Sequence, residues 1–452
     1  MKIVISGLGK VGEVLARDLS HEKQDVIVID RDEEKVEKLI MSVDVTGIAG
    51  SASFLDVQME AGVDDCDVFI AVTPDDETNI IAGITAKKLG ARYVICRVRS
   101  PEYSEQFDFL RESLGINMLI NPDQEASREI ENILLFPAAL SVEHFGGTRV
   151  FMVQTVLSKD SLLAGKSLGE IGRGYGNVLI GVVERGDEVF IPDGSFVLLA
   201  GDNLYLTGES REILRFLHTN NNELYRPKSA LIVGGGRITR YLLARLNKHK
   251  IKVKVIEYDE VTANLLASEH PDAEIVLADG TDQKILREER MQNYDAVISL
   301  TGIDEENLLI SLYAAQQGVK STITKVNRTN LLKVLENVGL KAIVTPNKVI
   351  ADNIIRFVRS LQNTAGSSIE SFHRIGEGKV EALQFRVTDD SKVCNQPLRD
   401  LETKPDILIL CILRNNIIIF PDGNDSIQGG DSVIIVTKEP NFQDIADVLK
   451  EG

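Results

Sequence analysis

Two glycine-rich segments of this sequence have the residue types and spacing of phosphate-binding loops. Residues 7–12 read GLGKVG, and residues 234–239 read GGGRIT. Each segment follows a short apolar run and opens an amphipathic stretch, which is the setting in which G-x-G-x-x-G binds a dinucleotide. There the first glycine permits a tight turn, the second lets the backbone approach a pyrophosphate, and the third lets helix and strand pack closely. The free N–H groups at the start of the following helix would hold the phosphate.

An acidic residue follows each loop at the position that recognises a ribose. Asp30 ends the next apolar run after the first loop, and Glu257 does so after the second. A carboxylate there accepts hydrogen bonds from the ribose hydroxyls and repels a 2′-phosphate, so both sites should prefer NAD or an adenosine nucleotide to NADP. Thr239 replaces the third glycine of the second loop, and its β-branch must be accommodated where helix and strand pack.

Further candidates lie where the later strands should end, because ligands bind at the carboxyl ends of parallel strands. Arg97 and Arg99 follow the fifth apolar run, and their spacing fits either a phosphate clamp or a solvated strand end. Their counterparts are Lys325 and Asn327, which give the second site less positive charge. The acids at 75, 76, 304 and 305 are expected to be helix caps and first-turn acids.

The residues predicted to bind nucleotide at the first site are Gly7, Leu8, Gly9, Lys10, Val11, Gly12, Asp30, Arg31, Gly50, Ser51, Thr73, Asn79, Arg97 and Arg99. Those predicted at the second site are Gly234, Gly235, Gly236, Arg237, Ile238, Thr239, Glu257, Asp279, Thr301, Asn307 and Lys325.

The sequence favours binding without catalysis. The histidines do not recur between the two halves, whereas a duplicated active site should repeat its base. H-E-x-x-H, G-x-S-x-G and C-x-x-C are absent, and no His/Cys cluster has the spacing of a metal site. A dehydrogenase also needs a second domain that holds substrate and an acid/base group. An NAD-dependent oxidoreductase is kept as the alternative.

An internal repeat organises the elements that must position these residues. Asp30 and Glu257 are 227 residues apart, and the Gly-Asp pairs at 201 and 430 are 229 apart. In each half, short apolar runs alternate with amphipathic stretches before a region of closely spaced strands and turns. The predicted fold is α/β, a tandem duplication of a Rossmann-like doubly wound parallel-sheet domain followed by a small α+β domain. The four expected domains are residues 1–140, 141–225, 226–365 and 366–452.

Each half contains one amphipathic stretch whose packing partner the sequence does not determine. Residues 123–136 carry Ile130, Ile133 and Leu134 on one face, and the counterpart stretch carries Ile350, Ile354 and Phe357 similarly. Such a face packs in a core or docks on a partner protein.

Composition limits the remaining possibilities. The formal net charge is −18 with 43% hydrophobic residues, which suits a globular protein and disfavours nucleic acid as a partner. No apolar run approaches the ~20 residues that cross a bilayer, and the N-terminus begins directly with a strand-like run. We therefore expect a cytoplasmic protein without direct membrane insertion.

The sequence resembles RCK (KTN) domains, which regulate potassium conductance. The resemblance rests on GLGKVG, VIDRD, AVTPDDETN and RVRSPEY in the first Rossmann-type domain, and on GKSL, IPDG and GD in the β-rich segments. It covers nearly the whole chain. Two tandem RCK units on one chain are similar to the peripheral subunits of Trk potassium uptake systems, whereas single-unit regulators and channels with their own transmembrane helices match less well.

The resemblance implies a function that spacing alone does not give. Family members form a cytoplasmic ring, usually a homotetramer, beneath a membrane-embedded Trk-type potassium translocator. Binding of NAD(H), ATP or ADP in the Rossmann clefts would shift the population of ring shapes and gate the pore. The family often has Gly-Asp or Gly-Asn after the third strand. The second copy keeps this acid as Asp279, whereas the first has Ala49-Gly50-Ser51.

Overall fold

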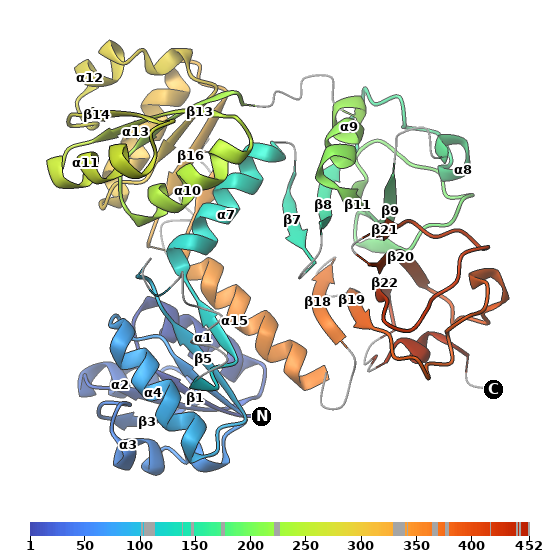
Figure 1. Cartoon of the computed structure of the whole chain (residues 1–452), viewed down its shortest axis with the longest axis horizontal. Helices are drawn as coiled ribbons and strands as arrows, with labels where there is room; N and C mark the ends of the chain where they lie inside the picture. The colour runs from blue at the N-terminus through green and yellow to red at the C-terminus, as the bar shows by residue number, and fades with distance from the viewer. Residues whose placement is uncertain are drawn as a thin grey trace. The chain divides into compact units, whose positions relative to one another are not determined.

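The computed structural model divides the chain into two compact units (Figure 1). The first combines residues Met1–Leu135 with Pro227–Val358, and the second combines Phe136–Arg226 with Arg359–Gly452. Each unit therefore takes one part from each half of the repeat. The structure describes residues 1–100, 103, 114–137, 139–145, 149–172, 177–220, 227–328, 340, 342–363, 369–375, 379–415, 417–439, 442 and 444–450.

The first lobe, residues 1–135, is a Rossmann-type domain. Its strands are β1 (Lys2–Ser6), β2 (Asp25–Asp30), β3 (Thr46–Ala49), β4 (Val68–Ala71), β5 (Tyr93–Arg97) and β6 (Met118–Ile120). Its helices are α1 (Lys10–His21), α2 (Glu33–Ile40), α3 (Leu55–Glu60), the 3₁₀ turn η1 (Val63–Asp65), α4 (Asp76–Leu89) and α7 (Pro122–Leu135). The strands run parallel in the order β3-β2-β1-β4-β5-β6. The order reverses between β1 and β4, where such sheets hold their ligands.

The second lobe, residues 227–358, repeats this topology. Its strands are β12 (Ser229–Val233), β13 (Lys252–Glu257), β14 (Glu274–Leu277), β15 (Ala296–Ser299), β16 (Ser321–Lys325) and β17 (Ala342–Val344), in the order β14-β13-β12-β15-β16-β17. Its helices are α10 (Arg237–Lys248), α11 (Glu260–Glu269), α12 (Gln283–Glu288), η3 (Met291–Asn293), α13 (Asp304–Gln316) and α15 (Pro346–Asn363). The central strands β4 and β15 are buried along their whole length, as expected for parallel strands covered on both faces.

Helix α7 leaves its own lobe and packs on the other. Ala126, Ile130 and Leu134 lie in the hydrophobic core of the second lobe, against residues of α10 and the β12 sheet. In the reciprocal position, Phe357 of α15 meets Tyr93 of the first lobe edge-on, with ring centroids 6.4 Å apart. The amphipathic face of α7 thus packs in a core, but that core belongs to the other half of the repeat (Figure 1).

Two small antiparallel domains form the second unit. The first contains β7 (Ser141–His144), β8 (Val150–Val156), α8 (Leu168–Ile171), β9 (Val178–Arg185), β10 (Glu188–Phe190), β11 (Asn203–Glu209) and α9 (Ser210–Asn220), with the strand order β10-β9-β11-β8-β7. The second contains β18 (Ile369–Ile375), β19 (Val380–Arg386), η6 (Leu398–Asp400), β20 (Ile407–Arg414), β21 (Ile417–Ile419), β22 (Ser432–Thr437) and η7 (Ile445–Val448), with the equivalent order read from the other edge. One hydrophobic cluster includes residues of both domains, among them Met152 and Ile434.

The repeated Gly-Asp pair has a structural role in these domains. Asp202 accepts two hydrogen bonds from the guanidinium group of Arg185, at 2.7 and 2.8 Å, and Asp431 accepts two from Arg414 in the same way. Each arginine also donates to a backbone carbonyl a few residues before its aspartate, that of Val197 or of Ser426. The predicted fold, a duplicated Rossmann-like domain with a small α+β domain, is confirmed. No helix in the described part of the chain is long and apolar enough to cross a membrane.

Candidate functional site

The first glycine loop has the conformation that its glycines require. Gly7 has a φ of +99°, and a Cβ atom there would lie 2.8 Å from the backbone nitrogen of Thr73. A Cβ atom on Gly12 would lie 1.8 Å from the carbonyl oxygen of Gly7, so helix α1 meets the loop too closely for a side chain. Gly9 is the N-cap of α1, with no heavy atom within 4 Å of an added Cβ. Leu8 and Val11 are buried and support the loop by packing.

The acid at the end of the second strand binds the loop in both lobes. Asp30 accepts a hydrogen bond of 2.5 Å from the backbone N–H of Leu8, and Glu257 accepts one of 2.5 Å from that of Gly235. The longer glutamate comes so close that a Cβ on Gly235 would lie 2.9 Å from its Oε2 atom. The shorter aspartate thus leaves room for the side chain of Leu8, whereas the longer glutamate requires a glycine at the equivalent position 235.

Thr239 fits into the second loop through a hydrogen bond. Its hydroxyl donates to the carbonyl oxygen of Gly234 at 2.5 Å, the group that Gly12 approaches closely in the first lobe. The β-branched side chain is therefore accommodated, and Gly234 keeps the positive φ (+102°) of its counterpart Gly7.

Buried asparagines connect the fourth strand of each lobe with the fifth. Asn79 accepts from the N–H of Thr73 and donates to the carbonyls of Thr73 and Arg97. Asn307 makes the equivalent bonds to Thr301 and to the carbonyl of Lys325. Both amides are wholly buried and act within the protein. They fix the loop and the backbone of the cationic residue, and their contact with nucleotide stays a prediction.

The acids at the starts of α4 and α13 are structural, as expected. Asp75 caps α4 through the N–H of Thr78, and Asp76 accepts from the N–H groups of Arg99 and Ser100. Asp304 accepts from the N–H groups that follow β16. Although burial raises the pKa of Asp304, these bonds and those from the Asn327 and Arg328 side chains hold it below its ordinary value.

The residues after the third strand lie at the edge of the sheet beside the acids. Arg31 donates to the hydroxyl of Ser51 at 3.0 Å, and the N–H of Gly50 donates to the carbonyl of Asp30. In the second lobe, Asp279 accepts from both the N–H and the hydroxyl of Thr281, bonds that lower its pKa. Nothing further in the described residues assigns a ligand to them.

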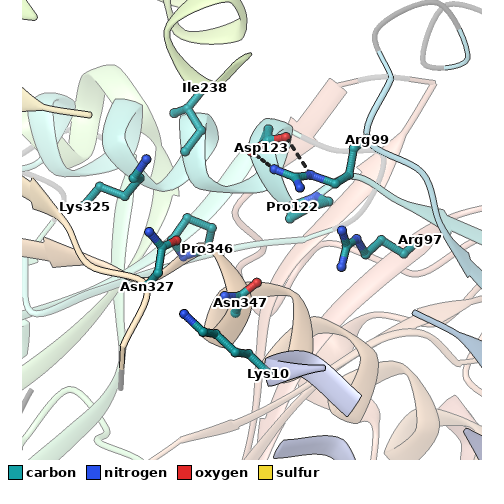
Figure 2. Close-up of a pocket in the computed structure, with 10 residues that line it drawn as sticks. All are labelled: Lys10, Arg97, Arg99, Pro122, Asp123, Ile238, Lys325, Asn327, Pro346 and Asn347. Atoms are coloured by element: carbon teal, nitrogen blue, oxygen red, sulfur yellow. Dashed lines mark hydrogen bonds and ion pairs between the residues drawn. The ribbon is translucent and has the colours of Figure 1, made fainter. Parts of the chain in front are cut away.

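A pocket of about 210 Å³ lies between the two lobes, where their glycine-loop helices begin (Figure 2). Its lining residues are Lys10, Arg97, Arg99, Pro122, Asp123, Ile238, Lys325, Asn327, Pro346 and Asn347. Four of them carry positive charge and one is a carboxylate. In a chain of net charge −18, this concentration of cations is suited to an anion.

Burial disfavours the charged form of two of these cations and lowers their pKa values. Burial, reinforced by the positive charge of Arg99, lowers the pKa of Arg97 to about 10. The Nε atom of Arg97 is buried, with no hydrogen-bond partner among the described residues. Burial likewise lowers the pKa of Lys325, whose ammonium group donates to the carbonyl oxygen of Leu300 at 3.4 Å. An anion in the pocket would relieve both groups.

Asp123 connects the two lobes at this pocket. Its Oδ2 atom lies 3.1 Å from Nε of Arg99 and 3.0 Å from Nε of Arg237, the first residue of α10. The carboxylate side chain is only 7% exposed. Asp123 and Asn347 are not among the residues predicted from the sequence to bind nucleotide. The available signal was their place directly after the last strand of each sheet, where ligands gather.

The structure brings some of the predicted site residues together at the pocket and leaves others beside the loop of their own lobe. Lys10, Arg97, Arg99, Ile238 and Lys325 line one pocket although they come from both lobes, and Arg237 reaches it through Asp123. The acids of the second strands, with the residues after the third strands, remain beside the loop of their own lobe. No group of three or more potential ligands for a metal ion occurs in the described part of the chain.

Comparison with known proteins gives the family. Residues 3–122 and 230–346 match the TrkA-N domain, and residues 152–219 and 382–450 match the TrkA-C domain. The chain is 31% identical to the Trk system potassium uptake protein TrkA homolog of Archaeoglobus fulgidus over 100% of both chains. It is 29% identical to the Trk system potassium uptake protein TrkA of Halomonas elongata, over 100% of this chain and 99% of that one.

Solved structures share the fold. The GsuK channel aligns with a TM-score of 0.64 at 18% identity, over 96% of this chain and 76% of its own. The GsuK channel bound to NAD aligns over the same shares with a TM-score of 0.63, also at 18% identity. With two TrkA-N and two TrkA-C domains in alternation, and a relative that matches along its whole length, the chain belongs to the TrkA family.

Proposed function

We propose that this chain is the nucleotide-binding regulatory subunit of a Trk-type potassium uptake system. The observation that carries the proposal is the pocket between the lobes, which gathers cations from both copies beside both glycine loops. Relatives along the whole length are named as potassium uptake proteins, which supplies the transport process. Residues for binding recur between the copies, whereas none of the recurring motifs supplies a catalytic base.

The proposed ligands are NAD(H) and ATP or ADP, one nucleotide in each Rossmann cleft. The loop N–H groups and the helix N-termini would hold the phosphates, and Asp30 or Glu257 would exchange its bond to the loop for bonds to a ribose. Because a carboxylate repels a 2′-phosphate, NADP is disfavoured in both clefts. The GsuK channel, which shares the fold, has been solved bound to NAD.

Gating would follow from the way that the pocket joins the lobes. A phosphate group held by cations from both lobes binds best in one mutual orientation of those lobes. It therefore shifts the population towards that orientation. The crossed helices α7 and α15 carry this change, because each begins beside the pocket and packs on the opposite lobe. A nucleotide without differential affinity for the two orientations would shift nothing.

The proposed partner is a membrane-embedded Trk-type potassium translocator, with the chain as a peripheral subunit on the cytoplasmic side. A closed homotetramer is proposed as the assembly, since soluble homo-oligomers adopt closed symmetry. Nucleic acid is not among the proposed partners.

Reconstituted vesicles test the proposal. The translocator is reconstituted in potassium-loaded vesicles together with this chain, either the parent or the double variant Asp30→Ala, Glu257→Ala. Potassium flux is then measured with and without ATP or NADH. We expect the variant to bind the translocator but to lose control of flux by nucleotide. Glu33→Ala with Glu260→Ala is the matched control, since it removes two equivalent, exposed acids from the starts of α2 and α11. Equal modulation of flux in parent and double variant would refute the gating account.

A further inference from the structure

The two copies meet at the pocket with equivalent residues. Lys10 and Arg237 are the first residues of the glycine-loop helices, Arg97 and Lys325 end the fifth strands, and Asp123 and Asn347 are the second residues of the crossed helices. A site built from two identical copies would be symmetric. This one differs in charge at two positions, because Asp123 corresponds to the neutral Asn347 and Arg99 to the neutral Asn327.

The charge difference changes the surroundings of the two loops. Asp123 pairs with Arg237 at 3.0 Å and so places an anion from the first lobe beside the N-terminus of α10. Asn347, in the equivalent position, lines the pocket with Lys10 and brings no charge to the N-terminus of α1. Among the described residues, no carboxylate forms an ion pair with Lys10. The cation that opens the helix after the second loop, Arg237, is thus already paired with an anion, whereas its counterpart Lys10 has no ion pair among the described residues.

The size of the pocket indicates which part of a ligand it receives. Sites for whole small molecules usually measure about 300–1,000 Å³, and this pocket measures about 210 Å³. It therefore suits the charged end of a ligand whose remainder lies in a cleft. The first lobe's cations at the pocket are Lys10, Arg97 and Arg99. Arg99 is paired with Asp123, whereas the buried Nε atom of Arg97 has no hydrogen-bond partner among the described residues.

We infer that Asp123 and Asn347 determine nucleotide specificity. The pocket accepts the terminal phosphate of one triphosphate, and this triphosphate is bound in the first cleft. The second cleft takes a nucleotide that ends at its diphosphate, such as NAD(H) or ADP, because a further phosphate would meet the carboxylate of Asp123. This inference rests on the proposed binding of nucleotide in both clefts. It assigns the choice of ligand to a residue pair outside both glycine loops.

Blocking one cleft at a time makes the test specific. Gly9 and Gly236 are helix N-caps with negative φ and open space around an added Cβ, so Gly9→Asp and Gly236→Asp should fold. Each new carboxylate would occupy the phosphate position of its own loop. Gly236→Asp then reports on the first cleft, and Gly9→Asp on the second.

Calorimetric titration with ATP and with ADP gives the readout, which is the ratio of the two affinities. We expect ATP to bind more tightly than ADP in the first cleft and more weakly in the second. In the Gly9→Asp background, Asp123→Asn should raise the affinity for ATP roughly ten- to hundred-fold with little change for ADP, since a bond to a charged group becomes available. In the Gly236→Asp background, Asn347→Asp should lower the affinity for ATP by a similar factor.

The outcomes separate this inference from the proposed function. Equal ATP-to-ADP ratios in the two clefts, or an Asp123→Asn variant that changes both affinities alike, would overturn the inference and leave nucleotide binding intact. Absence of any nucleotide binding would overturn both. Asp123→Asn deprives Arg99 and Arg237 of their partner, so it could unfold the lobe contact. Asn347→Asp breaks no ion pair, and an unchanged ratio in that variant is sufficient to refute the inference.

Discussion

At the scale of single residues, the two glycine loops show how a motif tolerates substitution. The first loop needs glycine at position 12, because a Cβ would collide with the carbonyl of Gly7. The second loop has threonine there and turns the collision into a hydrogen bond with Gly234. A sequence comparison alone scores Thr239 as a departure, whereas the hydroxyl donor explains why the loop survives.

Asp30 should contribute directly to the binding of nucleotide. Asp30→Ala removes the proposed ribose acceptor, and a hydrogen bond to a charged group is worth about 1.5–3 kcal/mol, so affinity should fall roughly ten- to hundred-fold. Titration calorimetry in the Gly236→Asp background measures this for the first cleft alone. Glu33→Ala serves as the control, and unchanged affinity in Asp30→Ala would remove this residue from the site.

The two glycines of the first loop should respond differently to a methyl group. Gly12→Ala forces the start of α1 away from the loop and should destabilise the fold by about 1–3 kcal/mol, as overpacking usually does. Gly9→Ala meets no atom and should leave the free energy of unfolding within about 1 kcal/mol of the parent. Urea unfolding of the two variants provides the measurement. Equal losses would mean that the loop adapts at both positions.

At the scale of elements, the sequence was informative about each copy but silent on how the copies exchange helices. Hydrophobic periodicity predicted the parallel strands and the amphipathic character of α7, because these depend on neighbours along the chain. It left the partner of α7 open, since an apolar face looks the same whichever core receives it. The role of Asp123 was missed for the same reason: its partner Arg237 is 114 residues away and in the other lobe.

Shortening a buried side chain of α7 should therefore destabilise the second lobe, although α7 belongs to the first lobe in sequence. Ile130 is wholly buried in the second lobe's core, and Ile130→Ala should cost about 2–5 kcal/mol. Hydrogen exchange should then show loss of protection in β12 and β13. Val94→Ala, in the core of the first lobe, is the matched comparison and should leave those two strands protected. Loss confined to the first lobe after Ile130→Ala would contradict the crossed packing.

The Gly-Asp turn should give the first small domain a defined sensitivity to acid. Burial raises the pKa of Asp202, but the hydrogen bonds from Arg185 and Leu199 outweigh it, and the pKa lies below its ordinary value of 3.8. The stabilisation is therefore complete above that value and is lost as the pH falls through the lower folded-state pKa. Asp202→Asn should cost about 1–3 kcal/mol at pH 7, and the difference from the parent should shrink below pH 3.8. Urea unfolding at pH 7 and pH 3 compares the two proteins. A difference independent of pH would rule out this role.

At the scale of the whole molecule, the proposed function predicts a phenotype that follows from binding alone. In the proposed function, the residues that recur between the copies bind nucleotide, and the chain acts on transport by holding a partner and a nucleotide. Deletion of the protein should impair high-affinity potassium uptake in its host, measured as growth and potassium content at low external potassium. Complementation by the parent should restore uptake, and the Asp30→Ala, Glu257→Ala variant should not restore its control by nucleotide. Normal uptake in the deletion strain would contradict the proposal.

The exchange of α7 and α15 takes place within one polypeptide, and this has a consequence for what the site can become. Two separate copies of a single unit would form a symmetric dimer, in which any change appears twice and opposite itself. Here the two copies are linked in one chain, so equivalent positions can hold different residues, as Asp123 and Asn347 do. The connection also holds the partner at a high effective concentration, so dilution cannot mispair or separate the lobes. The two nucleotide clefts of one chain can therefore differ in the ligand that they select.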